Sequence, residues 1–161
     1  MVEIVKYDNS YLGYNLDLEI LQNLSLSQNI EEETRERIFI KDICKKVKKS
    51  KTVLYILKNN TIIIGLVAIS VTSSINEQPS IQIDYIFINS NYRGKSLEIL
   101  ENTKPFRYLI EFVIDVAKRL QSEVGLRYII LSPDNDNLKE KYNNLGFQKL
   151  AKSIEWMYLK I

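Results

Sequence analysis

Hydrophobic positions recur at helical spacing in several segments of the chain. Apolar residues at helical intervals predict a short helix over Asn15–Asn23. The segment Asn29–Lys49 predicts a stronger helix, because glutamates fill its first turn and lysines fill its last, as the helix dipole favours. An apolar stripe predicts a long helix over about Lys104–Gln121. A short polar helix is expected to end at Gly146, because glycine fits the left-handed position that terminates helices.

Runs of β-branched and aromatic residues predict the strands. Val2–Tyr7 reads as the first strand. The stretch TVLYILKNNTIIIGLVAISV carries two such runs around Lys58-Asn59-Asn60, which predicts an antiparallel hairpin. After a loop around Pro79, the remaining strands are predicted at Ile81–Ile88, Leu126–Leu131, Phe147–Leu150 and Glu155–Ile161.

The order of these elements limits the fold class. The hairpin excludes a purely parallel, doubly wound sheet, whereas the strand–helix–strand crossover from Ile81 to Leu131 requires a parallel pair. We therefore predict an α/β (α+β) fold with a mixed, mostly antiparallel sheet, one parallel crossover and flanking helices. No repeat, low-complexity tract or linker interrupts the sequence, so residues 1–161 are expected to form a single domain.

Composition restricts the chemistry more than the class of protein. The hydrophobic fraction of 45%, the charged fraction of 26% and the net charge of +2 are those of an ordinary globular protein. There is no histidine, which excludes histidine-based triads and bases, and a single cysteine leaves only carboxylates for a metal site. We therefore expect no metal cofactor.

The same composition carries an expectation about location. No apolar run approaches the roughly 20 residues of a membrane span, and the N-terminal residues lack the pattern of a signal peptide. We expect a cytoplasmic protein with no membrane partner. Cys44 lies on an apolar helix face and is expected to be a core residue. The run KDICKKVKKSK is expected to be a solvated helix end, with attraction of an acidic partner such as RNA as the alternative.

Two stretches carry a family resemblance. YIFINSNYRGKS, Tyr85–Ser96, is similar to a strand followed by the phosphate loop V-x-P-x-Y-R-G-K-G-x-G. NDNLKEKYNNLGFQKL, Asn135–Leu150, is similar to N-x-x-A-x-x-F-Y-x-x-x-G-F. With the element order, these stretches make the chain resemble the GCN5-related N-acetyltransferase (GNAT) superfamily over essentially its whole length. The resemblance implies the GNAT fold and transfer of an acetyl group from acetyl-CoA to a primary amine.

The resemblance also implies where acetyl-CoA binds. The fourth and fifth strands of the family splay apart, and the pantetheine arm pairs with backbone that corresponds here to Phe87 and Ile88. The pyrophosphate of the family sits on amides at a helix N-terminus. Asn135 matches the residue that orients the pantetheine amide, and its alternative role is to cap the last helix.

The phosphate loop departs from the family pattern. Where the family has glycine after the Arg-Gly-Lys sequence, this chain has Ser96 and several further residues before the helix. In one interpretation the first end of the loop cradles the pyrophosphate and the insertion bulges outward. In the other, the amides of Asn102–Phe106 form the cradle, with Lys104 and Arg107 supplying charge. We expect both ends to contribute, through Arg93, Gly94, Lys95, Ser96 and Lys104.

The resemblance assigns the catalytic groups. Tyr142 occupies the position that often protonates the departing thiolate, and its alternative is a tyrosine that only packs locally. Asp84, a carboxylate in an apolar strand, is the candidate general base, with a salt bridge to a lysine as the alternative. A water chain without a dedicated base also remains open.

The acceptor and partners stay broad at this level. The resemblance allows a small molecule, a peptide or protein, or an aminoacyl-tRNA if the chain is a toxin with an antitoxin partner. The acceptor pocket would be built from the first two helices and the loop near Ser73–Ser80. A homodimer is also compatible with the family. The altered phosphate loop supports one alternative from another class, a non-catalytic acyl-CoA sensor or interaction module on the same fold.

Overall fold

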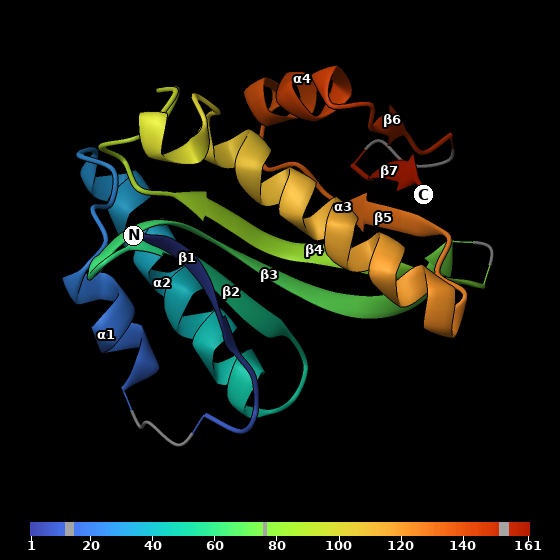
Figure 1. The fold of residues 1–161 in the computed structure, drawn as a ribbon, viewed down its shortest axis with the longest axis horizontal. Helices are drawn as coiled ribbons and strands as arrows, with labels where there is room; N and C mark the ends of the chain where they lie inside the picture. Colours follow the sequence, from blue (N-terminus) through green and yellow to red (C-terminus); the bar gives the residue numbers. More distant parts are fainter. Residues whose placement is uncertain (12–14, 76, 152–154) are drawn as a thin grey trace. The chain divides into compact units, whose positions relative to one another are not determined.

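The structure, a computed structural model, describes residues 1–11, 15–75, 77–151 and 155–161. The side chains of residues 74 and 75 are also outside the description. The elements along the chain (Figure 1) are β1 Val2–Tyr7, α1 Leu16–Gln22, α2 Ile30–Lys48, β2 Val53–Asn59, β3 Ile62–Ile75, β4 Gln78–Ile88, the 3-10 helix η1 Glu98–Leu100, α3 Pro105–Val124, β5 Tyr128–Leu131, α4 Asp136–Asn144, β6 Gln148–Lys149 and β7 Met157–Lys160.

The predicted order of helices and strands is confirmed, and the largest differences lie around the β3–β4 connection. Pro79 was expected in a loop, but β4 already begins at Gln78, so the strand includes the proline. A proline is compatible with the start of a strand, and the Pro79 carbonyl still accepts a hydrogen bond from the Arg127 amide at 2.9 Å. Asn76, in the predicted pocket loop, lies outside the described residues.

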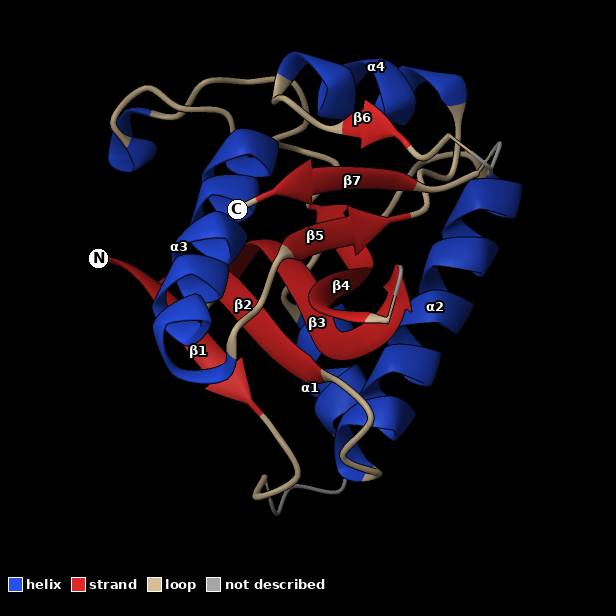
Figure 2. Ribbon diagram, turned by 90° about the vertical axis from the view of Figure 1, so that its right-hand side faces the viewer, coloured by secondary structure: helices blue, strands red, loops and turns tan. Residues whose placement is uncertain are grey.

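The strands form a seven-stranded sheet in the order β1-β2-β3-β4-β5-β7-β6, drawn in red in Figure 2. The β1–β2, β2–β3, β5–β7 and β6–β7 pairs are antiparallel, whereas β4 and β5 are parallel. The mixed sheet with one parallel crossover is the predicted fold class. None of the helices within the described segments has the length and apolar character needed to cross a membrane.

Contacts divide the chain into two compact units. The first unit comprises Met1–Ile69 and Tyr85–Leu109, and the second comprises Ser70–Asp84 and Ile110–Ile161. The breaks fall inside β3, β4 and α3, so each of these elements runs through both units. The single domain predicted from the sequence remains a prediction.

The core of the first unit joins two helices to the strands. Apolar faces of α1 and α2 contribute Leu16, Ile20, Ile40, Ile43 and Cys44 to a cluster that also contains strand residues such as Leu54, Leu66 and Phe87. Burial raises the pKa of the Cys44 thiol to about 12, with Asp17 adding to the rise and Lys48 opposing it. The prediction that Cys44 is a core residue is confirmed, because the side chain is buried in this cluster. A buried thiol with a raised pKa is a poor nucleophile.

The second unit is built around the latter part of α3 and the C-terminal strands. Its buried residues include Ile110 and Val113 of α3, Ile129 of β5 and Met157 of β7. The side chain of Gln121 donates hydrogen bonds to the carbonyl groups of Leu126 at 3.0 Å and of Ile161 at 3.1 Å. These bonds connect the end of α3 to the segment that precedes β5 and to Ile161.

Candidate functional site

The parallel pair formed by β4 and β5 is short. Its register joins Ser80 to Tyr128, Ile81 to Ile129, and Gln82 to Ile130. All residues of both strands are described, and the ladder contains no pair beyond Gln82, although β4 continues to Ile88. The two strands are therefore paired along only part of β4, and the backbone of its last residues stays outside the β4–β5 ladder.

The end of β4 packs closely against β3 in the first unit. A Cβ atom placed on Gly65 would lie 2.9 Å from the Phe87 carbonyl oxygen, 3.0 Å from Ile88 Cδ1 and 3.1 Å from Leu109 Cδ1. The separation from the backbone carbonyl is shorter than real Cβ atoms show, and the two side-chain separations are tight, so the site strongly favours glycine. The sequence analysis missed Gly65, because nothing near it in the sequence marks the requirement.

Arg93, the arginine of the phosphate-loop motif, binds several groups of the protein itself. Its Nε atom donates to the Ile88 carbonyl oxygen at 2.9 Å. Its Nη1 atom donates to Ser27 Oγ at 2.7 Å, and its Nη2 atom pairs with Glu36 Oε2 at 2.8 Å. The guanidinium carbon also lies 4.8 Å from the centroid of the Phe87 ring. This side chain therefore links the end of β4 to the start of α2.

The residues after Arg93 are exposed. Gly94 adopts a φ of +73°, and a Cβ atom there would meet no atom within 4 Å. Lys95 and Ser96 are exposed as well, and the Lys95 amide donates to the Tyr92 carbonyl at 3.2 Å. An exposed left-handed glycine beside a lysine is an arrangement that gives an anion access to the backbone.

The insertion in the phosphate loop is closed on itself. Leu97 and Thr103 form an antiparallel bridge, in which the Leu97 amide donates to the Thr103 carbonyl at 3.2 Å. Glu101 and Asn102 turn the chain with φ values of 55° and 61°, and Leu100 is buried. The bridge therefore brings together the two ends of the insertion, which continue into Ser96 and Lys104.

Helix α3 begins directly after this bridge. Pro105 is its first residue, and the Tyr108 amide donates to the Lys104 carbonyl at 3.0 Å. Proline suits this position because the first N–H of a helix has no partner within the helix. Lys104 thus places a positive charge at the start of the helix, beside the closed insertion.

Tyr142 lies on α4 and points into the interior of the second unit. It is only 2% exposed, and its ring packs edge-on against Phe147 with centroids 5.4 Å apart. Burial raises the pKa of the Tyr142 phenol well above its ordinary value of 10.0, with the charge of Asp134 as a smaller cause. The phenol therefore keeps its proton at neutral pH and can act as a donor.

The sequence around Tyr142 explains why α4 is so short. Gly146 adopts a φ of +98°, and the Tyr142 carbonyl accepts hydrogen bonds from the amides of Leu145 at 3.1 Å and Phe147 at 3.0 Å. At the other end, Asn135 Oδ1 accepts from the Leu138 amide at 2.9 Å, which makes Asn135 the N-cap. The capping role weighed for Asn135 is confirmed, and its role toward pantetheine stays a prediction.

Asp84 lies on β4 within the second unit and is half-buried. One of its oxygens, Oδ1, accepts from Ser70 Oγ at 3.0 Å and from Gln82 Nε2 at 2.9 Å. Gln82 and Asp84 therefore share the strand face that alternation predicted. Both donors are neutral, and the salt bridge to a lysine stays the open alternative for Asp84.

The predicted site residues fall into two groups. Phe87, Ile88, the segment Arg93–Ser96 and Lys104 belong to the first unit, whereas Asp84, Asn135 and Tyr142 belong to the second. Within the first unit, Arg93 brings in two residues that the sequence analysis missed, Ser27 and Glu36. Over the described residues, no group of cysteine, aspartate and glutamate side chains could hold a metal ion.

Comparison with solved structures reveals similar folds. The toxin AtaT, in a tyrosine-to-phenylalanine variant bound to the C-terminus of its antitoxin AtaR, matches with a TM-score of 0.73 at 13% identity and covers 99% of this chain and 92% of that chain. AtaT complexed with acetyl-methionyl-tRNAfMet matches at 0.72 and 14% identity, covering 99% and 95%. AtaTR bound with acetyl-CoA matches at 0.72 and 16% identity, covering 99% and 92%.

These matches extend over nearly the whole chain, and they confirm the fold predicted from the sequence. At this level of identity the likeness concerns the fold alone. No model of a protein family matches the sequence. No curated protein matches it either.

Proposed function

We propose that this chain, which has the GNAT fold, is an N-acetyltransferase that uses acetyl-CoA. The observation that carries the proposal is the early end of the β4–β5 ladder, after Gln82 and Ile130. Strand backbone left outside a ladder retains its capacity for hydrogen bonding, so it can pair with an extended amide-containing ligand. The pantetheine arm of acetyl-CoA is such a ligand, and AtaTR, with a similar fold, has been determined with acetyl-CoA.

The first unit offers groups that suit acetyl-CoA. Phe87 and Ile88 would present backbone to the pantetheine arm through groups other than their carbonyls, because the Phe87 carbonyl lies against Gly65 and the Ile88 carbonyl accepts from Arg93 Nε. The exposed Gly94–Ser96 segment would present its backbone to the pyrophosphate, with Lys95 and Lys104 supplying positive charge from the two ends of the closed insertion. Bound there, acetyl-CoA supplies an acetyl group activated as a thioester.

Tyr142 is proposed as the general acid. In the transfer, the acceptor nitrogen forms a bond to the acetyl carbon while the carbon–sulfur bond breaks, and the sulfur needs a proton. The phenol of Tyr142 holds a proton over the whole neutral range, because the ordinary phenol pKa of 10.0 already lies above it and burial raises this pKa further. AtaT, which has a similar fold, has also been determined with one of its tyrosines replaced by phenylalanine.

Asp84 is proposed as the group that receives the proton of the acceptor amine. Its Oδ1 atom accepts hydrogen bonds from Ser70 and Gln82, which orient the carboxylate. A water chain is the alternative route for this proton. An Asp84→Asn variant tests the assignment, because it should lower turnover and change the pH dependence only if the carboxylate is the acceptor of the proton.

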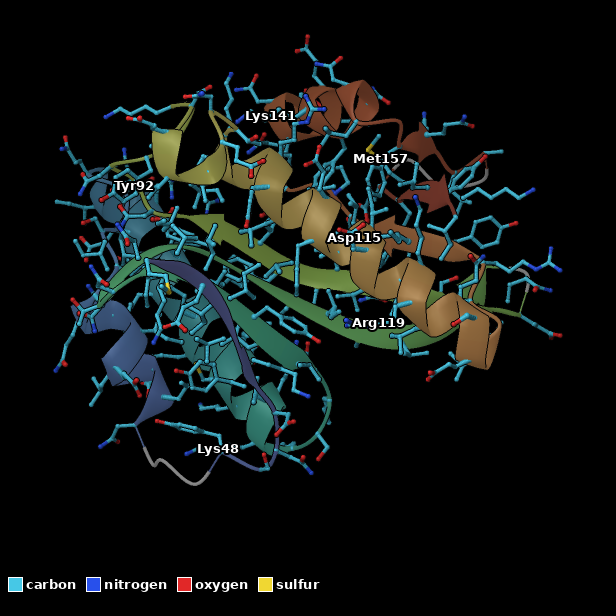
Figure 3. The ribbon with its side chains drawn as sticks, in the orientation of Figure 1. Lys48, Tyr92, Asp115, Arg119, Lys141 and Met157 are labelled. Atoms are coloured by element: carbon cyan, nitrogen blue, oxygen red, sulfur yellow. The ribbon has the colours of Figure 1, made fainter. Side chains whose placement is uncertain are left out.

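For the acceptor, we propose the amino group of an aminoacyl-tRNA. AtaT has been determined with acetyl-methionyl-tRNAfMet, which is the product expected of such a transfer. The present chain also concentrates exposed positive charge at the end of α2, where Figure 3 labels Lys48. This lysine end consists of Lys41, Lys45, Lys46, Lys48, Lys49 and Lys51, all exposed, and Lys46 pairs with Asp42 at 3.1 Å.

Such a surface suits RNA phosphates, since lysines neutralise phosphate charge and release counterions. An acceptor of this kind would make the chain a toxin, and an antitoxin partner would follow, as AtaR accompanies AtaT. The homodimer considered from the sequence remains a prediction.

Release of free coenzyme A from acetyl-CoA, measured with a panel of amines and aminoacyl-tRNAs, tests the proposal. We expect turnover with an aminoacyl-tRNA. A Lys41→Glu, Lys45→Glu, Lys49→Glu triple variant should bind tRNA more weakly, and the affinity should depend less on salt concentration. The matched control reverses Lys118, Lys149 and Lys160, which are exposed elsewhere. Tight binding of acetyl-CoA without turnover on any amine would favour the sensor instead.

A further inference from the structure

The side chain of Arg93 binds groups of the protein itself, although 40% of it remains exposed. It is turned toward the protein, where it joins the end of β4 to Ser27 and Glu36 near the start of α2. We infer that Arg93 is a positioning residue that fixes the end of β4 for the thioester arm and does not bind the pyrophosphate. The inference rests on the proposed function, because it assigns the arginine a role in binding the same acetyl-CoA.

The first support is that the donors of the guanidinium are distributed over three protein acceptors. Nε, Nη1 and Nη2 donate to Ile88 O, Ser27 Oγ and Glu36 Oε2 at 2.9, 2.7 and 2.8 Å. Arginine alone offers a rigid planar fork that can serve three directions at once. These contacts are short and charge-assisted and use three of the five N–H donors, so a phosphate would meet only the second hydrogens of Nη1 and Nη2, on a side chain that is 40% exposed.

The second support is that Glu36 and Ser27 form a closed unit with the arginine. The Ser27 amide donates to Glu36 Oε1 at 2.8 Å, and Ser27 Oγ donates to Glu36 Oε2 at 2.8 Å. Ser27 is 8% exposed, and the Glu36 side chain is 15% exposed. The guanidinium of Arg93 stabilises this sheltered carboxylate. The carboxylate in turn holds the guanidinium in place.

The third support is the need of β4 for a fixed end. On the β5 side, the strand loses its ladder after Gln82, and the proposed function uses the freed backbone for the thioester arm. On the β3 side, the Asn89 amide donates to the Ile64 carbonyl at 2.9 Å, and the Asn89 side chain donates to the Ile63 carbonyl at 2.8 Å. The arginine also holds the Ile88 carbonyl, so this carbonyl is occupied by the protein and the neighbouring backbone that would meet the ligand is preorganised.

A pair of ligands separates positioning from phosphate binding. Acetyl-CoA carries the pyrophosphate, whereas S-acetyl-pantetheine carries the same thioester arm without it. An Arg93→Gln variant should weaken binding of both ligands by the same factor, about tenfold, as expected for loss of a charge-assisted hydrogen bond. Lys95→Gln serves as the comparison, because loss of a phosphate contact should weaken acetyl-CoA and leave S-acetyl-pantetheine unchanged.

For a Glu36→Gln variant, the two roles of Arg93 predict opposite changes in the affinity for acetyl-CoA. If Arg93 bound the pyrophosphate, Glu36→Gln would remove a competing negative charge and tighten acetyl-CoA binding. If Arg93 positions β4, Glu36→Gln should weaken both ligands. Arg93→Lys sharpens the same contrast, because lysine keeps the charge but cannot serve three acceptors, so it should fail to restore either affinity.

Affinities are measured by calorimetry at a temperature at which circular dichroism shows each variant folded. If Arg93→Gln does not fold, Ser27→Ala replaces it, because it removes one acceptor of the same arginine. This variant should also weaken the binding of both ligands by the same factor, but by less. A loss confined to acetyl-CoA in Arg93→Gln, or tighter binding in Glu36→Gln, would overturn the inference and leave the proposed function intact. Wild-type protein that binds neither ligand would overturn the proposed function and the positioning role together.

Discussion

The segment from the end of β4 to the start of α3 and the helix that carries Tyr142 were both singled out by sequence motifs, but they are held together differently. The helix is fixed by short-range contacts, such as the Asn135 cap on Leu138 and the hydrogen bond from Phe147 to Tyr142. The segment after β4 is fixed by partners far away in the sequence, since Arg93 lies 66 residues from Ser27 and 57 from Glu36. The structural role of a motif with local contacts can be predicted from the sequence, whereas a motif residue with distant partners can have a different role.

The largest effect is expected at the tyrosine. Tyr142→Phe should lower turnover by about 100-fold or more, the usual contribution of a general acid, and should leave acetyl-CoA affinity unchanged. Phenylalanine keeps the packing on Phe147, so folding should be preserved. Tyr158→Phe, which removes a hydroxyl that donates to Gln148 in the same unit, is the control and should retain full turnover. Unchanged turnover in Tyr142→Phe would reduce Tyr142 to a packing residue.

Gly65 of β3, which packs against the end of β4, and Gly146, which follows α4, should respond in opposite ways to the type of substitution. Gly65→Ala should lower the free energy of unfolding by about 2 kcal/mol through overpacking against Phe87 and Leu109, and Gly65→Asn by more. Gly146→Ala should cost about 1 kcal/mol, because its φ of +98° strains an L-residue. Asparagine tolerates left-handed backbone, so Gly146→Asn should recover part of that loss. Urea denaturation distinguishes them, and equal tolerance of asparagine at both glycines would remove the distinction between local and tertiary constraint.

Each unit contains a buried group whose raised pKa links stability to alkaline pH. In the unfolded chain the Cys44 thiol ionises near its ordinary pKa of 9.0, whereas the folded thiol stays protonated until about 12. The unfolded state therefore binds fewer protons in this window, and the free energy of unfolding should fall there by up to about 1.4 kcal/mol per pH unit. Stability below pH 9.0 is fully retained.

Cys44→Ala should flatten this fall, even though the smaller side chain lowers stability at every pH. Tyr142→Phe should reduce the fall in the free energy of unfolding that begins near the ordinary phenol pKa of 10.0. Denaturant titrations from neutral to alkaline pH measure both slopes. A slope in Cys44→Ala as steep as in the wild type would show that the thiol does not carry the effect.

The smallest effect is expected at the start of α4. Asn135→Ala should lower the free energy of unfolding by about 1 kcal/mol through loss of the cap, whereas Asn135→Asp keeps an acceptor for the Leu138 amide and should be nearly neutral. The aspartate lacks the amide donor, so it separates capping from ligand binding. A stable Asn135→Asp variant with weakened acetyl-CoA binding would support the pantetheine role, and unchanged binding would leave the cap as the only role of Asn135.

Sequence reasoning succeeded where the structure depends on short-range rules. The bounds of β1 were predicted to the residue, and α2 was predicted from its acidic start and basic end. The burial of Cys44 followed from its apolar helix face. The strand that contains Pro79 was longer than expected, because a proline near the start of a strand does not end it.

The sequence by itself determined the order of elements, the parallel crossover in a mixed sheet, and the short helix that places Tyr142, since caps, turns and periodicity act within a few residues. Only the tertiary structure decided where the β4–β5 ladder stops, why position 65 favours glycine, and which groups Arg93 binds. These features depend on which distant backbone and side-chain groups packing brings within hydrogen-bond or van der Waals distance, and local patterns in the sequence do not encode that.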